Sequence, residues 1–233
     1  MPYWPSLGSY AKTIDAAIYA PNDSILCSAM HPTTAPAMDR EIEAIHEFWF
    51  GPLDAVGLCT AEQHQLWFAV NTQSDAWIRN RFGSLVEDAL AGDLDDWCDD
   101  DLGIVALVLL LDQFTRNIYR HTAQAFAGDE AALAVANLAL ETGRCLALPA
   151  IHRVFLLLPL EHSEDVLAQD ECVNQFLELE RQYPDERVTR FTQYAQAHRD
   201  VIAQFGRFPH RNAVLGRAST PAEKAFLQHH KGF

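Results

Sequence analysis

Apolar residues recur at three- and four-residue spacing after residue 38, and this periodicity constrains the fold more than any other feature of the chain. Ile42, Ile45 and Trp49 follow the spacing as far as a helix stop at Gly51 and Pro52. No runs of alternating apolar and polar residues bounded by hairpin turns are found. The sequence therefore predicts an all-α fold built from amphipathic helices of about 10–20 residues.

Capping signals give the expected helix starts. Residues 60–63 match the capping-box pattern, Ser74 and Asp75 precede the next periodic segment, and residues 220–223 combine an N-cap threonine, a first-turn proline and a capping glutamate. Helices of this length with short loops predict antiparallel pairs stacked in a right-handed, tetratricopeptide-like manner, although no clear sequence repeat is visible.

The first 38 residues differ from the rest of the chain. They contain five prolines and many small polar residues, and they lack the basic start and apolar stretch of a secretory signal. We interpret residues 1–38 as an irregular N-terminal extension and residues 39–233 as a single all-helical domain. Because Met38 directly precedes the first periodic segment, it is also a plausible translation start.

Composition narrows the classes of partner and compartment. The 233 residues are 49% hydrophobic, enough for one sizeable core, and carry a formal net charge of −15, which argues against binding to nucleic acid or anionic membranes. The longest aliphatic run, residues 104–111, is too short to cross a bilayer. The five cysteines are widely spaced without a paired motif, so we expect no disulfide framework and a cytoplasmic, reducing location.

A cationic segment stands out in this acidic chain. Residues 201–222 contain three arginines and a histidine but no aspartate or glutamate. The segment is punctuated by glycine, proline and phenylalanine. Such a segment requires either carboxylate partners within the fold or an anion from outside.

A second polar motif follows the aliphatic run. In a regular helix Asp112, Arg116 and Arg120 would form one stripe, with Gln113 and Asn117 beside it. Two arginines next to a buried helix need carboxylates or an anionic ligand. A structural ion-pair network and a clamp for a ligand anion are both consistent with this pattern.

The third motif joins a carboxylate to an imidazole. Glu161 beside His162 offers general acid–base chemistry. The structural alternative is that these residues begin a helix, with Ser163 as N-cap and with Glu161, Glu164 and Asp165 favoured by the helix dipole.

Metal binding is the weaker alternative. His162, His198 and His210 could converge with carboxylates on a mononuclear site. A dimetal bundle needs two Glu-x-x-His motifs, and only Glu43 and His46 fit that spacing. We therefore assign no metal ligands, and the sequence identifies no cofactor.

These motifs resemble the signature of the "domain of unknown function 924" family. The resembling blocks are FWFG at residues 48–51, LDQFTRNIYR at 111–120, LPLEHSE at 158–164, and FGRFPHRN at 205–212 with LGR at 215–217. They occur in the family's order and cover about residues 41–227. The resemblance implies a bacterial-type cytosolic protein with a tetratricopeptide-like helical fold, and no activity. Thr115 stands where the family usually has proline, so we expect a less fixed turn after Phe114.

The candidate site residues coincide with the family's polar positions. We assign Glu161 and His162 as candidate catalytic residues. The candidate ligand-binding residues are Asp112, Gln113, Arg116, Asn117, Arg120, His198, Arg207, His210, Arg211 and Asn212.

Three hypotheses for function remain open. In the first, a concave face binds a small anionic ligand or a peptide carboxylate through Arg116, Arg120, Arg207 and Arg211. In the second, the same site is a hydrolase-type enzyme that uses Glu161 and His162 as an acid–base pair. In the third, the motifs are structural and the protein acts through protein contacts. Complete burial of Arg116, Arg207 and Arg211 in carboxylate pairs would favour the third.

Overall fold

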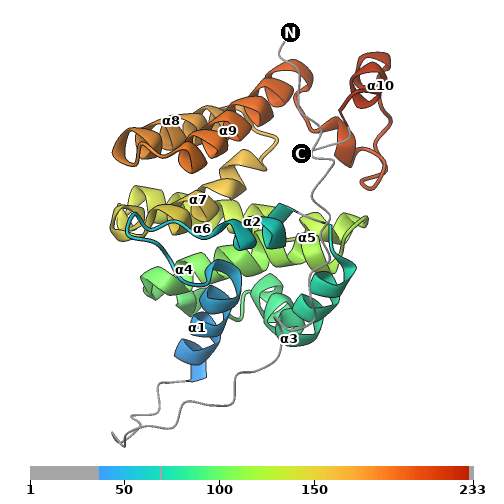
Figure 1. Ribbon diagram of the computed structural model, residues 1–233. Helices are drawn as coiled ribbons and strands as arrows, with labels where there is room; N and C mark the ends of the chain where they lie inside the picture. Colours follow the sequence, from blue (N-terminus) through green and yellow to red (C-terminus); the bar gives the residue numbers. More distant parts are fainter. Residues whose placement is uncertain (1–36, 69, 231–233) are drawn as a thin grey trace, which may run out of the picture. The chain divides into compact units, whose positions relative to one another are not determined.

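The structure, a computed structural model, describes residues 37–68 and 70–230 (Figure 1). Within these ranges it is all-α and contains no strand. The predicted extension lies almost entirely outside the described residues. The longer helices are α1 (Ala37–Phe50), α2 (Ala61–Phe68), α3 (Thr72–Ala91), α4 (Asp101–Val108), α6 (Asp129–Glu141), α7 (Ala150–Glu161), α8 (Val166–Gln182) and α9 (Glu186–Phe205).

One long helix runs through the middle of the domain. α4 continues without a break into the π-helical segment η3 (Leu109–Phe114) and then into α5 (Thr115–Ile118). The aliphatic run lies at its centre, and every residue of it is buried. α1, α3, α6 and α7 contact this helix from different sides, which explains why it is apolar all round.

The threonine that replaces the family's proline lies inside this helix. We expected a turn after Phe114, and this was wrong because the helix continues to Ile118. Thr115 is fully buried, and its Oγ1 donates a hydrogen bond of 2.7 Å to the Leu111 carbonyl. In the widened π-helical turn this hydroxyl supplies a donor to a backbone acceptor.

Two expected helix starts are corrected by the capping geometry. α3 begins at Thr72 rather than after Ser74, because Asn71 caps it by accepting from the amides of Gln73 and Ser74. α8 is capped by Asp165, whose side chain accepts from Leu167 and Ala168, and not by Ser163. The candidate catalytic residue Glu161 is therefore the last residue of α7 and does not begin a helix.

The second half of the domain is a set of packed helices. α7 is buried along its whole length. Residues 183–185 join α8 to α9, which lie side by side as an antiparallel pair (Figure 1). Tetratricopeptide-like stacking of such pairs stays a prediction.

The C-terminal segment, residues 206–230, has its own small apolar contact with α9. α9 ends at Gly206 in the left-handed conformation, φ +67°, and an irregular stretch then leads to α10 (Pro221–Leu227). Phe208 is fully buried against Val201 and Ile202. The capping box expected at Thr220 and Glu223 is confirmed.

No described helix is both long and apolar enough to cross a membrane.

The start of α6 is in close contact with the π-helical segment. A Cβ atom at Gly128 would overlap the backbone carbonyl of Leu111, whereas one at Gly83, within α3, would meet nothing. We predict that Gly128→Ala destabilises the protein by about 1–3 kcal/mol because the backbones must move apart. Gly83→Ala should instead stabilise it by about 0.5–1 kcal/mol through helix propensity. Urea unfolding of both variants checks this; equal stabilities would contradict the contact.

Candidate functional site

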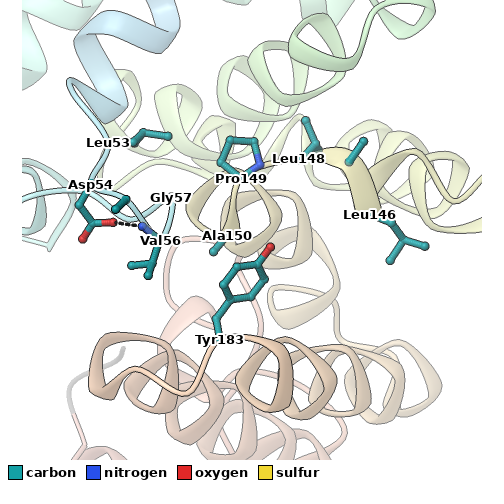
Figure 2. A pocket seen from close by; sticks show the side chains of 11 residues that line it. Leu53, Asp54, Val56, Gly57, Leu146, Leu148, Pro149, Ala150 and Tyr183 are labelled. Atoms are coloured by element: carbon teal, nitrogen blue, oxygen red, sulfur yellow. Dashed lines mark hydrogen bonds between the residues drawn. The ribbon is translucent and has the colours of Figure 1, made fainter.

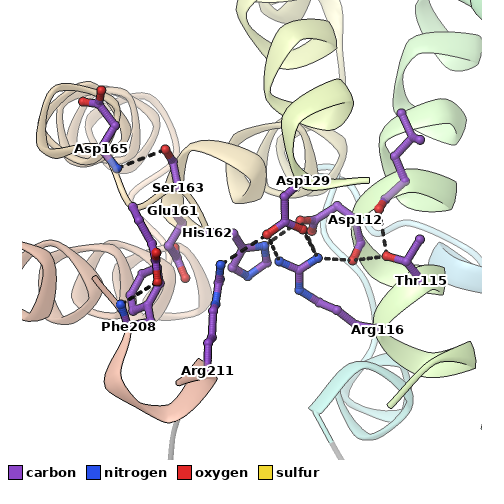
Figure 3. Close-up of polar contacts among 12 residues, drawn as sticks. Asp112, Thr115, Arg116, Asp129, Glu161, His162, Ser163, Asp165, Phe208 and Arg211 are labelled. Carbon is purple, nitrogen blue, oxygen red and sulfur yellow. Dashed lines mark hydrogen bonds and ion pairs between the residues drawn. The ribbon is translucent and has the colours of Figure 1, made fainter. Parts of the chain in front are cut away.

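Eight polar residues from distant parts of the chain meet beside the π-helical segment. Figure 3 shows Asp112, Arg116, Asp129, Glu161, His162 and Arg211 among them. We call all eight the central polar cluster. They come from the π-helical segment, α5, the start of α6, the end of α7, α9 and the C-terminal segment. Its members are Asp112, Arg116, Asp129, Glu161, His162, His198, His210 and Arg211.

Asp112 is the centre of the cluster. Its side chain is fully buried. Its Oδ1 accepts from His162 Nδ1 at 2.7 Å and forms an ion pair with Arg116 Nη1 at 3.1 Å, while its backbone carbonyl accepts from the same Nη1 at 2.7 Å. Its Oδ2 accepts from the side-chain amide nitrogen, Nε2, of Gln113. Burial opposes ionisation, but the charge of Arg116 and the contact with His162 outweigh it and hold the pKa of Asp112 below its ordinary value. Asp112 is thus a buried carboxylate at neutral pH.

The bond to Asp112 fixes the tautomer of His162. A carboxylate only accepts hydrogen bonds, so Nδ1 carries the proton and Nε2 is left as a base. Burial lowers the pKa of His162, and the charges of Arg116 and Arg211 lower it further against the opposing effect of Asp112. The ring is neutral near pH 7, and its side chain is 16% exposed, so solvent reaches it.

Asp129, the first residue of α6, is shared by two arginines. Its Oδ1 accepts from Arg116 at 2.8 Å, and its Oδ2 accepts from Arg211 at 3.2 Å. The Arg211 guanidinium lies between the rings of Phe126 and Phe208, 4.7 and 4.5 Å from their centroids. Burial, and then the charge of Arg116, lower the pKa of Arg211 to about 10. Arg211 is therefore a cation that its internal partner compensates only in part.

Glu161 is a second carboxyl group in the same cluster, and its protonation state is opposite to that of Asp112. Burial, and then the charge of Asp112, raise the pKa of Glu161 to about 8, so it is a neutral acid at pH 7. Its Oε1 lies 3.1 Å from His198 Nδ1. Its Oε2 is buried and has no hydrogen-bond partner among the described residues.

The other two imidazoles are neutral as well. His198 Nδ1 lies 2.9 Å from the Tyr194 carbonyl, which can only accept, so this nitrogen carries the proton. Burial, and then His162, lower the pKa of His198 to about 3. Burial, and then Arg211, lower the pKa of His210 to about 4.

The predicted stripe along the central helix is interrupted. Gln113 contacts Asp112, but the helix ends at Ile118, so Arg120 does not continue the line through Asp112 and Arg116. Arg120 instead forms a two-bond ion pair with Asp75 of α3, at 2.9 Å for each bond. Asn117 donates to the same carboxylate at 2.8 Å.

Two further candidates lie in the C-terminal segment, and each binds a partner within that same segment. Arg207 pairs with Glu223 of α10 at 2.6 Å. Asn212 is buried and donates to Ser219 Oγ at 3.1 Å. Neither residue contacts a member of the central polar cluster through these bonds.

The structure adds residues that the motifs did not indicate. Asp129 and Phe126 complete the surroundings of Arg211. The only sequence signal for Asp129 is its place after Gly128, at the start of an alanine-rich helix. That position marks a helix N-terminus but not a partner for two arginines.

The described residues hold no group of three or more histidine, cysteine or carboxylate side chains arranged to bind a metal ion. Cys59, Cys98, Cys145 and Cys172 are free thiols.

A surface pocket of about 570 Å³ lies apart from the cluster (Figure 2). It is formed by the loop after α1, the approach to α7, and Tyr183 beyond α8. Its lining is mainly aliphatic and shares no residue with the central polar cluster. The polar chemistry of the domain is therefore not in this pocket.

These features define an all-α protein with a buried cluster of carboxyl, imidazole and guanidinium groups. The chain belongs to the family described as bacterial protein of unknown function (DUF924), whose model matches residues 45–231, and this confirms the resemblance. A solved structure of a protein of unknown function from Agrobacterium tumefaciens is similar, with 31% sequence identity and a TM-score of 0.70. The match covers 83% of this chain and 99% of that one. No curated protein matches.

The raised pKa of Glu161 predicts a specific pH dependence of stability. The pKa is about 8 in the folded protein against an ordinary 4.5, so the folded state holds the extra proton between these values. Its contribution to stability is full below pH 4.5 and is lost as the pH rises towards 8. Glu161→Gln removes this loss, so the variant should gain about 2–4 kcal/mol relative to the wild type between pH 5 and about 8.5.

Urea unfolding at several pH values measures this difference. The buried histidines are present in both proteins, so their contributions cancel to first order. Glu130→Gln, an exposed change on α6, is the control and should give a flat difference. A flat difference for Glu161→Gln would show that the carboxyl is ionised in the folded protein.

Proposed function

We propose that the central polar cluster binds a small molecule with a carboxylate or phosphate group and carries out hydrolase-type acid–base chemistry on it. The observation that carries the proposal is the 2.7 Å hydrogen bond from His162 Nδ1 to Asp112. This bond orients a neutral, partly exposed imidazole with Nε2 directed to accept a proton. A buried carboxylate that fixes an imidazole in this way is the arrangement of a general base.

Glu161 supports the proposal as the matching acid. Two carboxyl groups whose surroundings move their pKa values in opposite directions are suited to opposite roles in proton transfer. Asp112 is ionised and supports the base, while Glu161 is neutral and can give up a proton. His198 neighbours both proposed groups. Its Nδ1 lies 3.1 Å from Glu161 Oε1, and its ring centroid lies 6.2 Å from that of His162.

In the proposed reaction His162 Nε2 takes a proton from a water molecule. The water oxygen forms a bond to an acyl carbon or phosphorus of the ligand. The bond from that atom to the leaving oxygen breaks, and the proton of Glu161 passes to the leaving oxygen. A pair of proton-transfer groups of this kind contributes typically about 10²–10⁴-fold for each group.

Arg211 supports the choice of an anionic ligand. Its aromatic neighbours orient the guanidinium without consuming its hydrogen-bond donors, and its contact with Asp129 is a single bond of 3.2 Å. Its Nε is buried and has no hydrogen-bond partner among the described residues. A carboxylate or phosphate beside it would add charge-assisted hydrogen bonds.

A purely structural role explains part of the motif. Arg116, Arg207 and Arg211 all have carboxylate partners, but their side chains are 20%, 28% and 7% exposed, so they are not all fully buried. Arg120 and Arg207 hold helices and loops together. Arg116 and Arg211, which share one carboxylate, are the arginines that we assign to the ligand.

Three further expectations stay proposals. A cytoplasmic location rests on the spacing of the cysteines, and tetratricopeptide-like stacking rests on the antiparallel pairing of α8 and α9. The partner we propose is the anionic small molecule rather than a peptide, because the contacts that support it lie within a largely buried cluster.

Binding of simple anions tests the assignment of Arg211. Titration with acetate and with inorganic phosphate, followed through the His162 imidazole resonances, should give saturable shifts in the wild type. Arg211→Gln should weaken binding at least about tenfold because the ligand loses charge-assisted hydrogen bonds. Arg120→Gln is the matched control and should bind as the wild type does, since Arg120 faces Asp75.

Turnover tests the acid–base roles separately. We expect slow hydrolysis of generic aryl esters or phosphoesters by the wild type, lowered about 10²-fold or more by His162→Gln and by Glu161→Gln. The same rates in wild type and both variants would refute the acid–base assignment. Equal anion affinity of the Arg211 and Arg120 variants would refute the binding assignment.

A further inference from the structure

The C-terminal segment forms one side of the central polar cluster but has few apolar contacts to hold it there. It contributes His210 and Arg211, and through Phe208 one of the two rings around Arg211. Phe208 is its buried apolar contact with α9. Pro209 is buried as well, and polar contacts add to these in the stretch between residues 208 and 217.

A single carboxylate makes most of these contacts. Glu164 lies in the loop after α7, two residues beyond His162. Its Oε1 accepts from the Phe208 amide at 2.8 Å and from Arg217 Nη2 at 2.9 Å, and its Oε2 accepts from Arg217 Nη1 at 2.5 Å. Arg217 also donates to the Phe208 carbonyl at 3.2 Å. Glu164 thus binds both ends of the stretch that carries His210 and Arg211.

The pair is partly protected from water, which strengthens it. The side chains of Glu164 and Arg217 are 26% and 24% exposed. Burial raises the pKa of Glu164, but the bonds from Arg217 and from the Phe208 amide outweigh this and hold it below its ordinary value. Glu164 is therefore ionised at neutral pH, and the two-bond pair has the geometry that Arg and carboxylates prefer.

We infer that Glu164 is a positioning residue for the site: it fixes the stretch 208–217 so that Arg211 stands beside His162 and Asp129. The inference rests on the proposed function for its meaning, although its geometry does not depend on a ligand. Glu164 lies only two residues beyond His162, in the loop after α7. Its bonds therefore join the segment that carries Glu161 and His162 to the segment that carries His210 and Arg211. Glu164 itself touches neither Asp112 nor His162 through the bonds described.

Glu164→Gln and Arg217→Gln test the inference. In Glu164→Gln an NH2 group, which only donates, stands in place of the oxygen that accepts from Arg217 Nη1, so the two-bond pair with Arg217 and its charge are lost. When Arg211 moves away, its charge no longer lowers the pKa of His162, which should rise by about half a pH unit in NMR titration. Acetate and phosphate affinity should fall about tenfold in both variants.

The His162 titration also reflects the other charged and titratable groups around it. These groups are Asp112, Arg116, Arg211, His198 and His210. Neither substitution changes any of them. Glu164→Gln removes a negative charge, which by itself would lower the His162 pKa, so a rise in this variant reports a change in their placement. Arg217→Gln removes a positive charge, so its rise is compared with that of the double variant, in which the two removed charges offset each other. The double variant should behave like either single variant, because the two side chains act as one unit.

Asp170→Asn is the matched control. It removes the exposed Arg199–Asp170 ion pair between α8 and α9, at 2.8 Å, in which no member of the cluster takes part. It should leave the His162 pKa and anion affinity unchanged, and the melting temperatures of all variants should stay close to that of the control.

The outcomes are separable. If the wild type binds neither anion, the proposed function fails, while the His162 pKa still tests Glu164. An unchanged His162 pKa in both Glu164→Gln and Arg217→Gln would overturn the inference. If Glu164→Gln does not fold, Arg217→Gln decides, because it keeps the bond between Glu164 and the Phe208 amide.

Discussion

The burial of the Asp112 carboxylate is the constraint on which the rest of the site depends. An ionised carboxyl with no exposed surface is costly by several kcal/mol unless it is paired and hydrogen-bonded. Asp112 meets this requirement with His162, the residue that follows α7, and with Arg116 from α5. The bond from His162 to Asp112 therefore fixes the end of α7 relative to the central helix. The bonds that meet this structural requirement are also the ones on which the proposed acid–base chemistry rests.

The arginines of the family motifs divide into two groups by their partners. Arg120, Arg207 and Arg217 each form a two-bond pair with a carboxylate of another element. These pairs join α3 to the end of α5 and hold the C-terminal segment in place. Arg116 also forms a two-bond pair, with Asp129, but it shares that carboxylate with Arg211. A chain with a net charge of −15 thus builds locally neutral sites, and the surplus of acid lies elsewhere.

Much of the fold could be predicted because helix periodicity and caps are local signals. These local signals do not report tertiary packing or departures from regular helix geometry, and the wrong predictions arose there. Ser163 and Asp165 are both good N-caps, and only tertiary packing places α8 after the second. The stripe through Arg120 assumed regular α geometry, which the π-helical turn and the helix end at Ile118 do not keep. Asp129 has no motif of its own, so its role emerges only when α6 meets α5. The motifs did indicate Asp112, Glu161 and His162. The opposite pKa shifts of the two carboxyl groups depend on which side chains the fold places beside each of them.

The π-helical segment has a consequence for how such proteins can change. Each residue in a helix turns the chain by about 100°, and a π turn contains roughly one residue more than an α turn. Loss of one residue between Leu109 and Phe114 would convert the π turn into an α turn of nearly the same rotation, so Arg116 would still face Asp129. Loss of one residue from a regular α turn of the same helix would instead rotate everything downstream by about 100° and turn Arg116 away from Asp129. Single-residue deletions should therefore be tolerated better in the π-helical segment than in the α-helical turns beside it.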